Sequence, residues 1–151
     1  MNKFMKLAIE EARKGIANNH GGPFGAVVVK DGKVIAKGHN HVVANNDPTC
    51  HGEIDAIRKA CKKLGTFDLS GCEVYTTGYP CPMCLSAMLW ANVDKFYYGC
   101  TIEDNENIGF RDKKFEDNLE KLGASMSEEV DRSECLNLFD DYLKITNKTM
   151  Y

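Results

Sequence analysis

Residues 72–99 alternate between strand and helix patterns, and this alternation restricts the possible folds more than any other feature of the chain. It predicts a strand at 73–77, a helix from the Cys81–Cys84 pair to about residue 91, and a strand at 95–99. A strand–helix–strand unit within one sheet places its two strands parallel, with a right-handed crossover. The chain is therefore expected to build an α/β sheet around this unit.

A hairpin precedes this unit. Residues 25–30 form a β-branched run, Asp31-Gly32 is a strong turn signal, and residues 33–37 return as a second strand. Apolar residues at helical spacing predict helices at 2–18 and 53–64. Two further helices are expected near 113–121 and 133–146, the second being the longer. We therefore predict one three-layer α/β/α domain over residues 1–151, with helices on both faces of a mixed sheet.

Three bulk properties restrict the cellular location and the classes of partner. The first residues show no secretory signal, and no apolar run approaches the roughly 20 residues needed to cross a bilayer. Seven cysteines, an odd number, indicate free thiols or metal ligands in a reducing cytoplasm rather than a disulfide framework. Residues 101–141 hold thirteen acidic and five basic side chains, which argues against a broad nucleic-acid-binding surface there. We expect a cytoplasmic protein without a membrane partner, and nucleic acid is disfavoured as a ligand.

Two short motifs carry the chemistry. His-Gly-Glu at 51–53 and Pro-Cys-Pro-Met-Cys at 80–84 each open a predicted helix. One imidazole and two thiolates suit zinc, and three protein ligands leave the fourth position of a catalytic zinc ion open for water. The positive end of each helix dipole favours thiolates nearby. We predict a catalytic zinc site formed by His51, Cys81 and Cys84.

The motifs also have other interpretations. A Cys-x-x-Cys pair alone can be redox-active, or it can form half of a structural zinc site that Cys50 or Cys100 would close. Glu53 favours catalysis, because a structural zinc ion has no use for a proton shuttle. Zinc lowers the pKa of a bound water towards about 7, and Glu53 would collect its proton and deliver it to the base and the departing amine. His-x-Glu followed by Pro-Cys-x-x-Cys is the signature of zinc deaminases.

In these motifs the chain resembles the cytidine deaminase-like superfamily, and within it the small bacterial guanine deaminases. The resemblance extends over nearly the whole chain and is carried by further segments at 22–27, 46–49, 56–61, 90–91, 109–110 and 147–151. It implies a roughly five-stranded sheet flanked by helices, and a homodimer in which C-terminal segments are exchanged between subunits. It also implies zinc-dependent hydrolytic deamination of a free nucleobase, guanine or a related aminopurine, with release of ammonia.

The resemblance also assigns roles to residues outside the zinc motifs. Asn40 would hold a ring carbonyl or nitrogen, Phe24 would stack on the base, and Trp90 would line the pocket. Asp104 would grip the N–H edge of the base. Tyr151 would close the site, from the partner subunit in an exchanged dimer.

Two departures from the guanine deaminase pattern concern the substrate. Tyr79 stands in the segment before the Pro-Cys pair where Glu is usual, so it would narrow or repolarise the pocket. Gly52 replaces a common Ala, and His-Gly-Glu-Ile after Gly-His-Asn also resembles fungal-type cytosine deaminases, which keeps cytosine as an alternative substrate. The tRNA adenosine deaminases share the core motifs but need a basic surface for the anticodon stem. The acidic C-terminal third disfavours that last alternative.

Overall fold

The computed structural model describes residues 1–151, and its internal contacts divide the chain into two compact units, Met1–Asp117 and Asn118–Tyr151. The single domain expected over the whole chain stays a prediction. No helix in either unit combines the length and the apolar character needed to cross a membrane.

The first unit contains the strands and helices that the sequence pattern predicts. Its elements follow in the order α1 (Lys3–Ala17), β1 (Gly25–Lys30), β2 (Lys33–His39), α2 (Val42–Asn45), α3 (Gly52–Leu64), β3 (Cys72–Gly78), α4 (Pro82–Trp90), β4 (Lys95–Cys100) and α5 (Ile102–Asn107). Two of these, α2 and α5, were not expected. Both are short helices within polar stretches that carry no apolar periodicity.

The sheet has four strands in the order β2-β1-β3-β4. β1 pairs antiparallel with β2 and β3, and β3 pairs parallel with β4, as the strand–helix–strand pattern predicts. The expectation of roughly five strands is wrong, because the chain turns into α5 directly after β4. The Thr101 hydroxyl accepts from the backbone N–H of Asp104, and the Asp104 carboxylate accepts from the backbone N–H of Thr101, a capping box that starts the helix.

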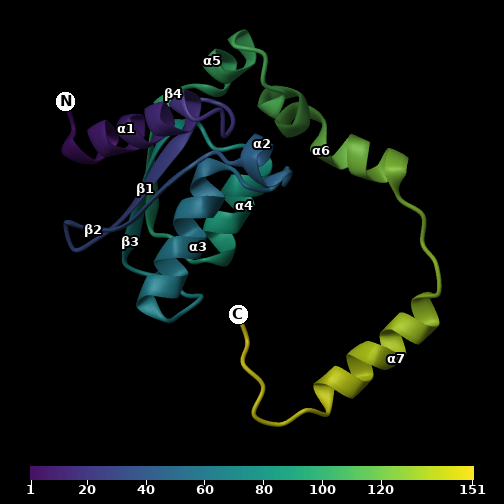
Figure 1. The fold of residues 1–151 in the computed structure, drawn as a ribbon. Helices are drawn as coiled ribbons and strands as arrows, with labels where there is room; N and C mark the ends of the chain where they lie inside the picture. The colour runs from purple at the N-terminus through teal and green to yellow at the C-terminus, as the bar shows by residue number, and fades with distance from the viewer. The chain divides into compact units, whose positions relative to one another are not determined.

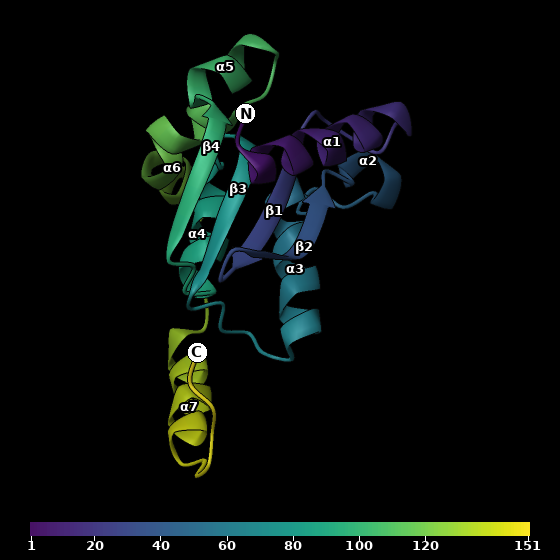
Figure 2. The same ribbon diagram turned by 90° about the vertical axis from the view of Figure 1, so that its left-hand side faces the viewer.

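Helices cover both faces of the sheet (Figures 1 and 2). Side chains along β1 alternate between the two faces. Val27 and Val29 belong to a core with Ala8 of α1, whereas Ala26 and Val28 belong to a core with residues of α3 and α4. A strand buried on both faces needs a nearly continuous apolar run, which β1 has. The three-layer α/β/α architecture is therefore confirmed.

The second unit is helical and has no core of its own. α6 (Asp112–Met126) begins in the first unit and ends in the second, where α7 (Arg132–Leu143) follows. Both predicted helices exist, but α6 has 15 residues and α7 has 12, the reverse of the expected order. No residue from 118 to 151 is buried. Its large apolar side chains are exposed, among them Leu138, Phe139 and Leu143.

Candidate active site

The starts of α3 and α4 bring His51, Cys81 and Cys84 together. His51 precedes α3 and Cys81 precedes α4, both with extended backbone, and Cys84 lies in the first turn of α4. The ligand atoms of the three residues lie within 4.8 Å of one another. The Nδ1 atom of His51 stands 3.5 Å from Cys81 Sγ and 3.6 Å from Cys84 Sγ.

These distances suit a zinc ion. Zn–N bonds of about 2.0–2.1 Å and Zn–S bonds of about 2.3 Å at tetrahedral angles place nitrogen and sulfur roughly 3.6 Å apart. One imidazole and two sulfurs are also donors that zinc prefers. Neither Cys50 nor Cys100 belongs to the cluster, while His51 and Cys81 line a cavity. The residues therefore fit a three-ligand site that is open to a small molecule rather than a structural site closed by a fourth protein ligand.

Hydrogen bonds set the protonation of this cluster. Bonds from Cys84 and His51 lower the pKa of Cys81 to about 4, although burial opposes this shift. The pKa of Cys84 moves upward, because Cys84 donates to Cys81 and is buried beside Glu53. The bond to Cys81 also raises the pKa of His51. Cys81 is therefore the thiolate of the pair, and Cys84 keeps a proton that a divalent cation would displace.

Glu53 stands beside the ligands in the first turn of α3. It is only 4% exposed, and its Oε1 atom accepts a hydrogen bond from Thr76 Oγ1 at 3.2 Å. Its Oε2 atom lies 3.5 Å from Cys84 Sγ. Burial raises the pKa of the Glu53 carboxyl. A carboxyl with a raised pKa exchanges protons more readily near neutral pH, as a general acid–base group must.

A cavity of about 370 Å³ opens beside these groups. This volume lies in the range of roughly 300–1,000 Å³ that is typical of small-molecule sites. The predicted site residues that line it are Phe24, Asn40, His51, Glu53, Tyr79 and Cys81. Lining residues outside the predicted set are Gly21, Gly22, Val42, Val43, Pro48, Phe110, Arg111 and Asp112.

The carboxamide of Asn40 has a fixed orientation. Its Oδ1 atom accepts from the backbone N–H of Val42 at 3.0 Å, which leaves its NH2 group as a donor for a ligand. Gly21 lies against this side chain, and a Cβ atom at position 21 would collide with Oδ1 of Asn40. Glycine at this position therefore gives Asn40 the room to take its place in the cavity wall.

Besides Glu53, the cavity is lined by a second acidic residue, Asp112, which sequence reasoning missed. The rings of Phe24 and Phe110 pack edge to face with centres 4.8 Å apart, and Asp112 follows two residues later at the start of α6. Its Oδ2 atom accepts from Asn105 Nδ2 at 3.3 Å, and burial raises the pKa of its carboxyl. The Gly109-Phe110 segment was the available signal, because Asp112 follows it closely, whereas Asp104, the acid expected from the resemblance, precedes it.

Tyr79 lies in the cavity wall where the sequence departs from the guanine deaminase pattern. Its backbone N–H donates to the carbonyl of Cys100 at 2.8 Å, and its own carbonyl accepts from Asn105 Nδ2 at 3.1 Å. Its ring packs edge to face against Phe96 and Tyr98. These contacts hold the backbone and the ring of Tyr79 next to the start of α4.

Trp90 and Asp104 are not among the residues that line the cavity. Trp90 ends α4, whereas Cys81 and Cys84 lie at its beginning, and it is 65% exposed. The Asp104 carboxylate is engaged in capping α5. Tyr151 belongs to the second unit and is 79% exposed. The roles that the resemblance implies for these three residues stay predictions.

Comparison with known proteins places the chain in a family. Residues 1–100 match the family model described as the cytidine and deoxycytidylate deaminase zinc-binding region. The matched residues include both the His-Gly-Glu and the Pro-Cys-Pro-Met-Cys motifs. This chain therefore belongs to the cytidine and deoxycytidylate deaminase family.

Individual relatives refine this assignment. Guanine deaminase from Bacillus subtilis (strain 168) is 41% identical over 151 residues, which is 98% of this chain and 97% of that protein. Its crystal structure matches with a TM-score of 0.93, covering 100% of this chain and 99% of that one. A structure of guanine deaminase from Nitrosomonas europaea matches with a TM-score of 0.68 at 38% identity, over 71% of this chain and 62% of that one.

A tRNA-specific adenosine deaminase from Aquifex aeolicus (strain VF5) is also similar, with 41% identity over 95 residues. This match covers 63% of this chain and 62% of that protein. The match to the Bacillus guanine deaminase thus covers a larger share of this chain than the match to this tRNA deaminase does.

Proposed function

We propose that this chain is a zinc-dependent guanine deaminase, which hydrolyses the exocyclic amino group from the free base and releases ammonia. One observation carries the proposal. A single cavity joins metal ligands and Glu53 to two polar groups that suit the edge of a purine, the NH2 of Asn40 and the carboxylate of Asp112. Similarity to a guanine deaminase over nearly the full length supports the same substrate.

The chemistry requires proton transfers that Glu53 is placed to perform. A zinc ion held by His51, Cys81 and Cys84 would supply a water molecule acidified to a pKa of about 7. Glu53 takes a proton from the attacking water and gives it to the ring nitrogen next to the amino-bearing carbon. It then moves the remaining hydroxyl proton to the amine, which leaves as ammonia while the new C=O bond forms. The hydrogen bond from Thr76 holds the carboxylate in place for both transfers.

Asn40 and Asp112 would orient the base. Guanine carries carbonyl and ring-nitrogen acceptors together with N–H donors. The Asn40 NH2 group donates to one of these acceptors, and the Asp112 carboxylate accepts from an N–H. Phe24 offers an aromatic surface for stacking, braced by Phe110. A ligand that cannot form these bonds leaves a buried polar group unpaired, at a cost of about 1–3 kcal/mol.

In this proposal Asp112 takes the role that the resemblance implied for Asp104. Tyr79 forms part of the wall beside the sulfur ligands and restricts which bases fit. Tyr151 closes the site from a partner subunit in the exchanged dimer, and the role of Trp90 in lining the pocket stays a prediction.

The second unit supports a homodimer with exchanged C-terminal segments. Its apolar side chains are exposed in the single chain, including Phe139, Tyr142, Leu143 and Ile145. Exposed apolar surface of this kind marks interaction sites, and a second copy of the chain is the partner that we propose.

All seven cysteines are free, which supports a location in the reducing cytoplasm.

A substrate panel tests the proposal. The zinc-loaded protein is incubated with guanine, cytosine, adenine, isoguanine, cytidine and guanosine, and ammonia release gives kcat/KM for each. We expect the highest kcat/KM for guanine. A preference for cytosine would retain the zinc chemistry and place the change of specificity at Tyr79. Activity on none of these compounds would contradict the proposal.

A further inference from the structure

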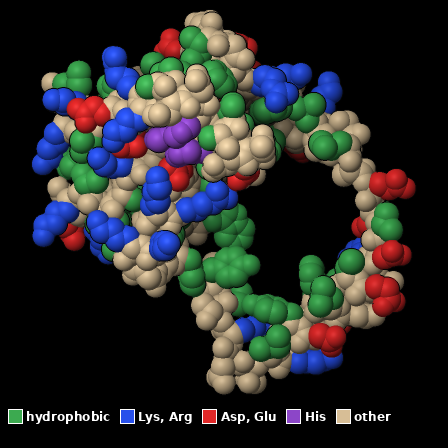
Figure 3. Space-filling model, viewed as in Figure 1, with side chains coloured by type: hydrophobic (Ala, Val, Ile, Leu, Met, Phe, Trp, Pro, Cys, Tyr) green, Lys and Arg blue, Asp and Glu red, His purple; other side chains and the backbone are tan.

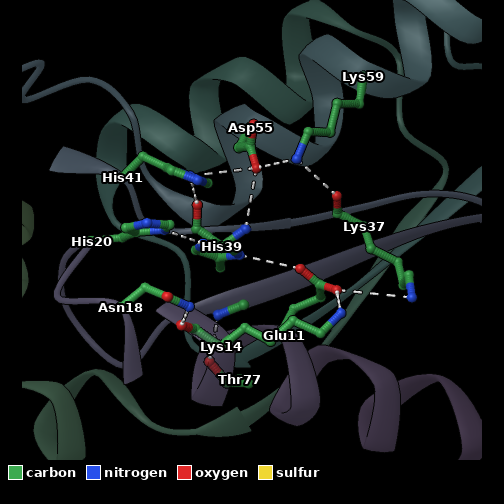
Figure 4. Close-up of polar contacts among 11 residues, drawn as sticks. Glu11, Lys14, Asn18, His20, Lys37, His39, His41, Asp55, Lys59 and Thr77 are labelled. Atoms are coloured by element: carbon green, nitrogen blue, oxygen red, sulfur yellow. Dashed lines mark hydrogen bonds and ion pairs between the residues drawn. The ribbon is translucent and has the colours of Figure 1, made fainter. Parts of the chain in front are cut away.

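A second cluster of metal-ligating side chains lies outside the active site. His20 follows α1, and His39 and His41 lie at the end of β2. One ring nitrogen of each residue lies within 4.8 Å of the others. The ring centres of His39 and His41 are 4.1 Å apart, and that of His20 lies 5.2 Å and 4.9 Å from them. Figure 3 shows histidine side chains gathered in one surface patch, and Figure 4 shows these three rings together.

The hydrogen bonds around the rings decide which nitrogen of each ring carries the lone pair. His39 Nδ1 is 3.1 Å from the carboxylate of Glu11, and His41 Nδ1 is 2.7 Å from the carbonyl of His39. Carboxylate and carbonyl oxygens only accept, so both rings donate from Nδ1. In a neutral imidazole the lone pair is then on Nε2. Burial lowers the pKa of His39, which favours its neutral form. His20 Nδ1 stands 2.9 Å from Nε2 of His39, the nitrogen that carries the lone pair.

Glu11 supports His39 as carboxylates support metal-bound histidines. Glu11 is 7% exposed. Its Oε1 atom also pairs with Nζ of Lys14 at 2.7 Å and with Nζ of Lys37 at 3.8 Å. Burial opposes ionisation, but the bonds from Lys14 and His39 lower the pKa of Glu11. A carboxylate on the far nitrogen of a histidine fixes the ring orientation and increases its strength as a metal ligand. Figure 4 shows this line of contacts from Lys14 and Lys37 through Glu11 to the histidines.

The fold makes room for the His39 ring. Gly15 lies in the body of α1, where glycine costs about 1 kcal/mol relative to alanine. A Cβ atom at position 15 would stand only 2.7 Å from Cδ2 of His39. The helix thus has a weak helix former at the position where the imidazole packs. On the other side, Asp55 accepts from the backbone N–H of His39 at 3.2 Å and pairs with Lys59 at 2.7 Å.

We propose that His20, His39 and His41 form a second site for a divalent transition-metal ion of the zinc class. Imidazole nitrogens suit zinc, copper and nickel. Two nitrogens on a tetrahedral zinc ion stand roughly 3.3 Å apart, so His20 Nδ1 and His39 Nε2, now 2.9 Å apart, must separate by a few tenths of an ångström. The His41 ring stacks on the other two rings at interplanar angles of 22° and 27°, so it must rotate to point its nitrogen at the ion. The ion replaces the proton between His20 and His39, and that proton moves to Nε2 of His20. The side chain of His41 is 20% exposed, which gives a route for the ion and for a water ligand.

The site would join two segments of the cavity wall. Gly21 and Gly22 follow His20, and Asn40 lies between His39 and His41. The backbone N–H groups of Val43 and Ala44 already donate to the carbonyl of His20. An ion shared by the three histidines would hold these segments together and stabilise the fold around Asn40. Metal binding here does not depend on the proposed guanine deaminase activity, and its test uses no activity measurement.

The test measures zinc bound per chain. Cys100→Ser/Cys135→Ser is the background protein, because these exposed thiols would bind zinc adventitiously. Protein already loaded at the cysteine site is titrated with Zn²⁺ against a competing chelator, and bound zinc and Tm are measured. We expect a second equivalent and a higher Tm. The additional changes His20→Gln and His41→Gln should remove both effects while the first equivalent remains.

Glu11 and its neighbour provide a matched pair. Glu11→Gln should weaken the second site by about 10- to 100-fold, as loss of a partner behind a metal ligand does. Glu10 is exposed on the same helix, and Glu10→Gln should leave both equivalents unchanged. One equivalent at saturating Zn²⁺ in the background protein would overturn the proposal. So would a second equivalent that survives the two histidine changes.

A spectroscopic measurement tests, without any histidine variant, whether the second metal ion binds at the histidines. Cobalt at the site with Cys81 and Cys84 gives thiolate-to-metal charge-transfer absorption, whereas cobalt held by imidazoles alone does not. The second equivalent of Co²⁺ is therefore expected to add only weak ligand-field bands. A further increase in thiolate absorption with the second equivalent would contradict the histidine site.

Discussion

Glu53→Gln removes the proposed proton shuttle while it preserves the shape of the side chain. The glutamine oxygen can still accept the hydrogen bond from Thr76. Loss of a positioned general acid–base group costs about 10²- to 10⁴-fold in kcat, which corresponds to roughly 2.7–5.4 kcal/mol of activation free energy. Because burial disfavours the charged form of Glu53, a neutral glutamine is not expected to lower Tm.

The assay compares ammonia release from guanine, zinc content and Tm for the wild type and Glu53→Gln. Glu73→Gln is the control, because Glu73 is a half-buried carboxylate on β3 that accepts from Tyr97 at 3.4 Å and does not line the cavity. The control should retain its kcat within about two-fold, because Glu73→Gln leaves the residues that line the cavity unchanged. A Glu53→Gln protein that keeps its zinc and turns over guanine at a similar rate would refute the role of Glu53.

Three further predictions follow from the cavity and its surroundings. Asp112→Asn should lower kcat/KM for guanine by about 10- to 150-fold, which is the value of a hydrogen bond to a charged group. Asp104→Asn should change only the stability of α5. Equal losses of kcat/KM in the two variants would contradict this assignment. Asn40→Asp keeps the acceptor for the Val42 N–H but loses the NH2 donor, so steady-state kinetics should show kcat/KM reduced by about 10-fold or more. Burial lowers the pKa of His39, so the unfolded chain binds more protons than the folded chain as the pH falls through about 6.5. Calorimetry should therefore show that Tm falls between about pH 7 and pH 5.5. The fall should be weaker in His39→Gln.

The metal-ligand cluster could be predicted because short sequence motifs specify both the ligands and the helix starts that carry them. Each motif combines ligands with the start of a helix, and zinc chemistry restricts which donors can act together. His51 and Cys81 do stand at two helix starts, as the sequence predicts. The strand–helix–strand unit and the hairpin were also predictable, since alternation and turn residues act over short distances.

The substrate side of the cavity depends on contacts between distant segments, which periodicity does not reveal. Asp112 reaches the cavity because Phe110 packs on Phe24, more than 80 residues earlier in the chain. Asp104 looked equally suitable in the sequence, but its spacing from Thr101 makes it part of a capping box. That capping box also explains why β4 is followed by a helix instead of a fifth strand.

The central claim is that this site hydrolyses guanine, and the most direct measurement follows the product in heavy-oxygen water. Zinc-loaded protein is incubated with guanine in this solvent, the purine product is analysed by mass spectrometry, and ammonia is measured in the same sample. Hydrolysis by the Glu53 site predicts xanthine that carries one heavy oxygen, with one ammonia released per guanine consumed. Under initial-rate conditions Glu53→Gln should form either product at least about 100-fold more slowly at equal protein concentration. Guanine that remains unchanged with the wild-type protein, or equal product formation by the variant, would contradict the account.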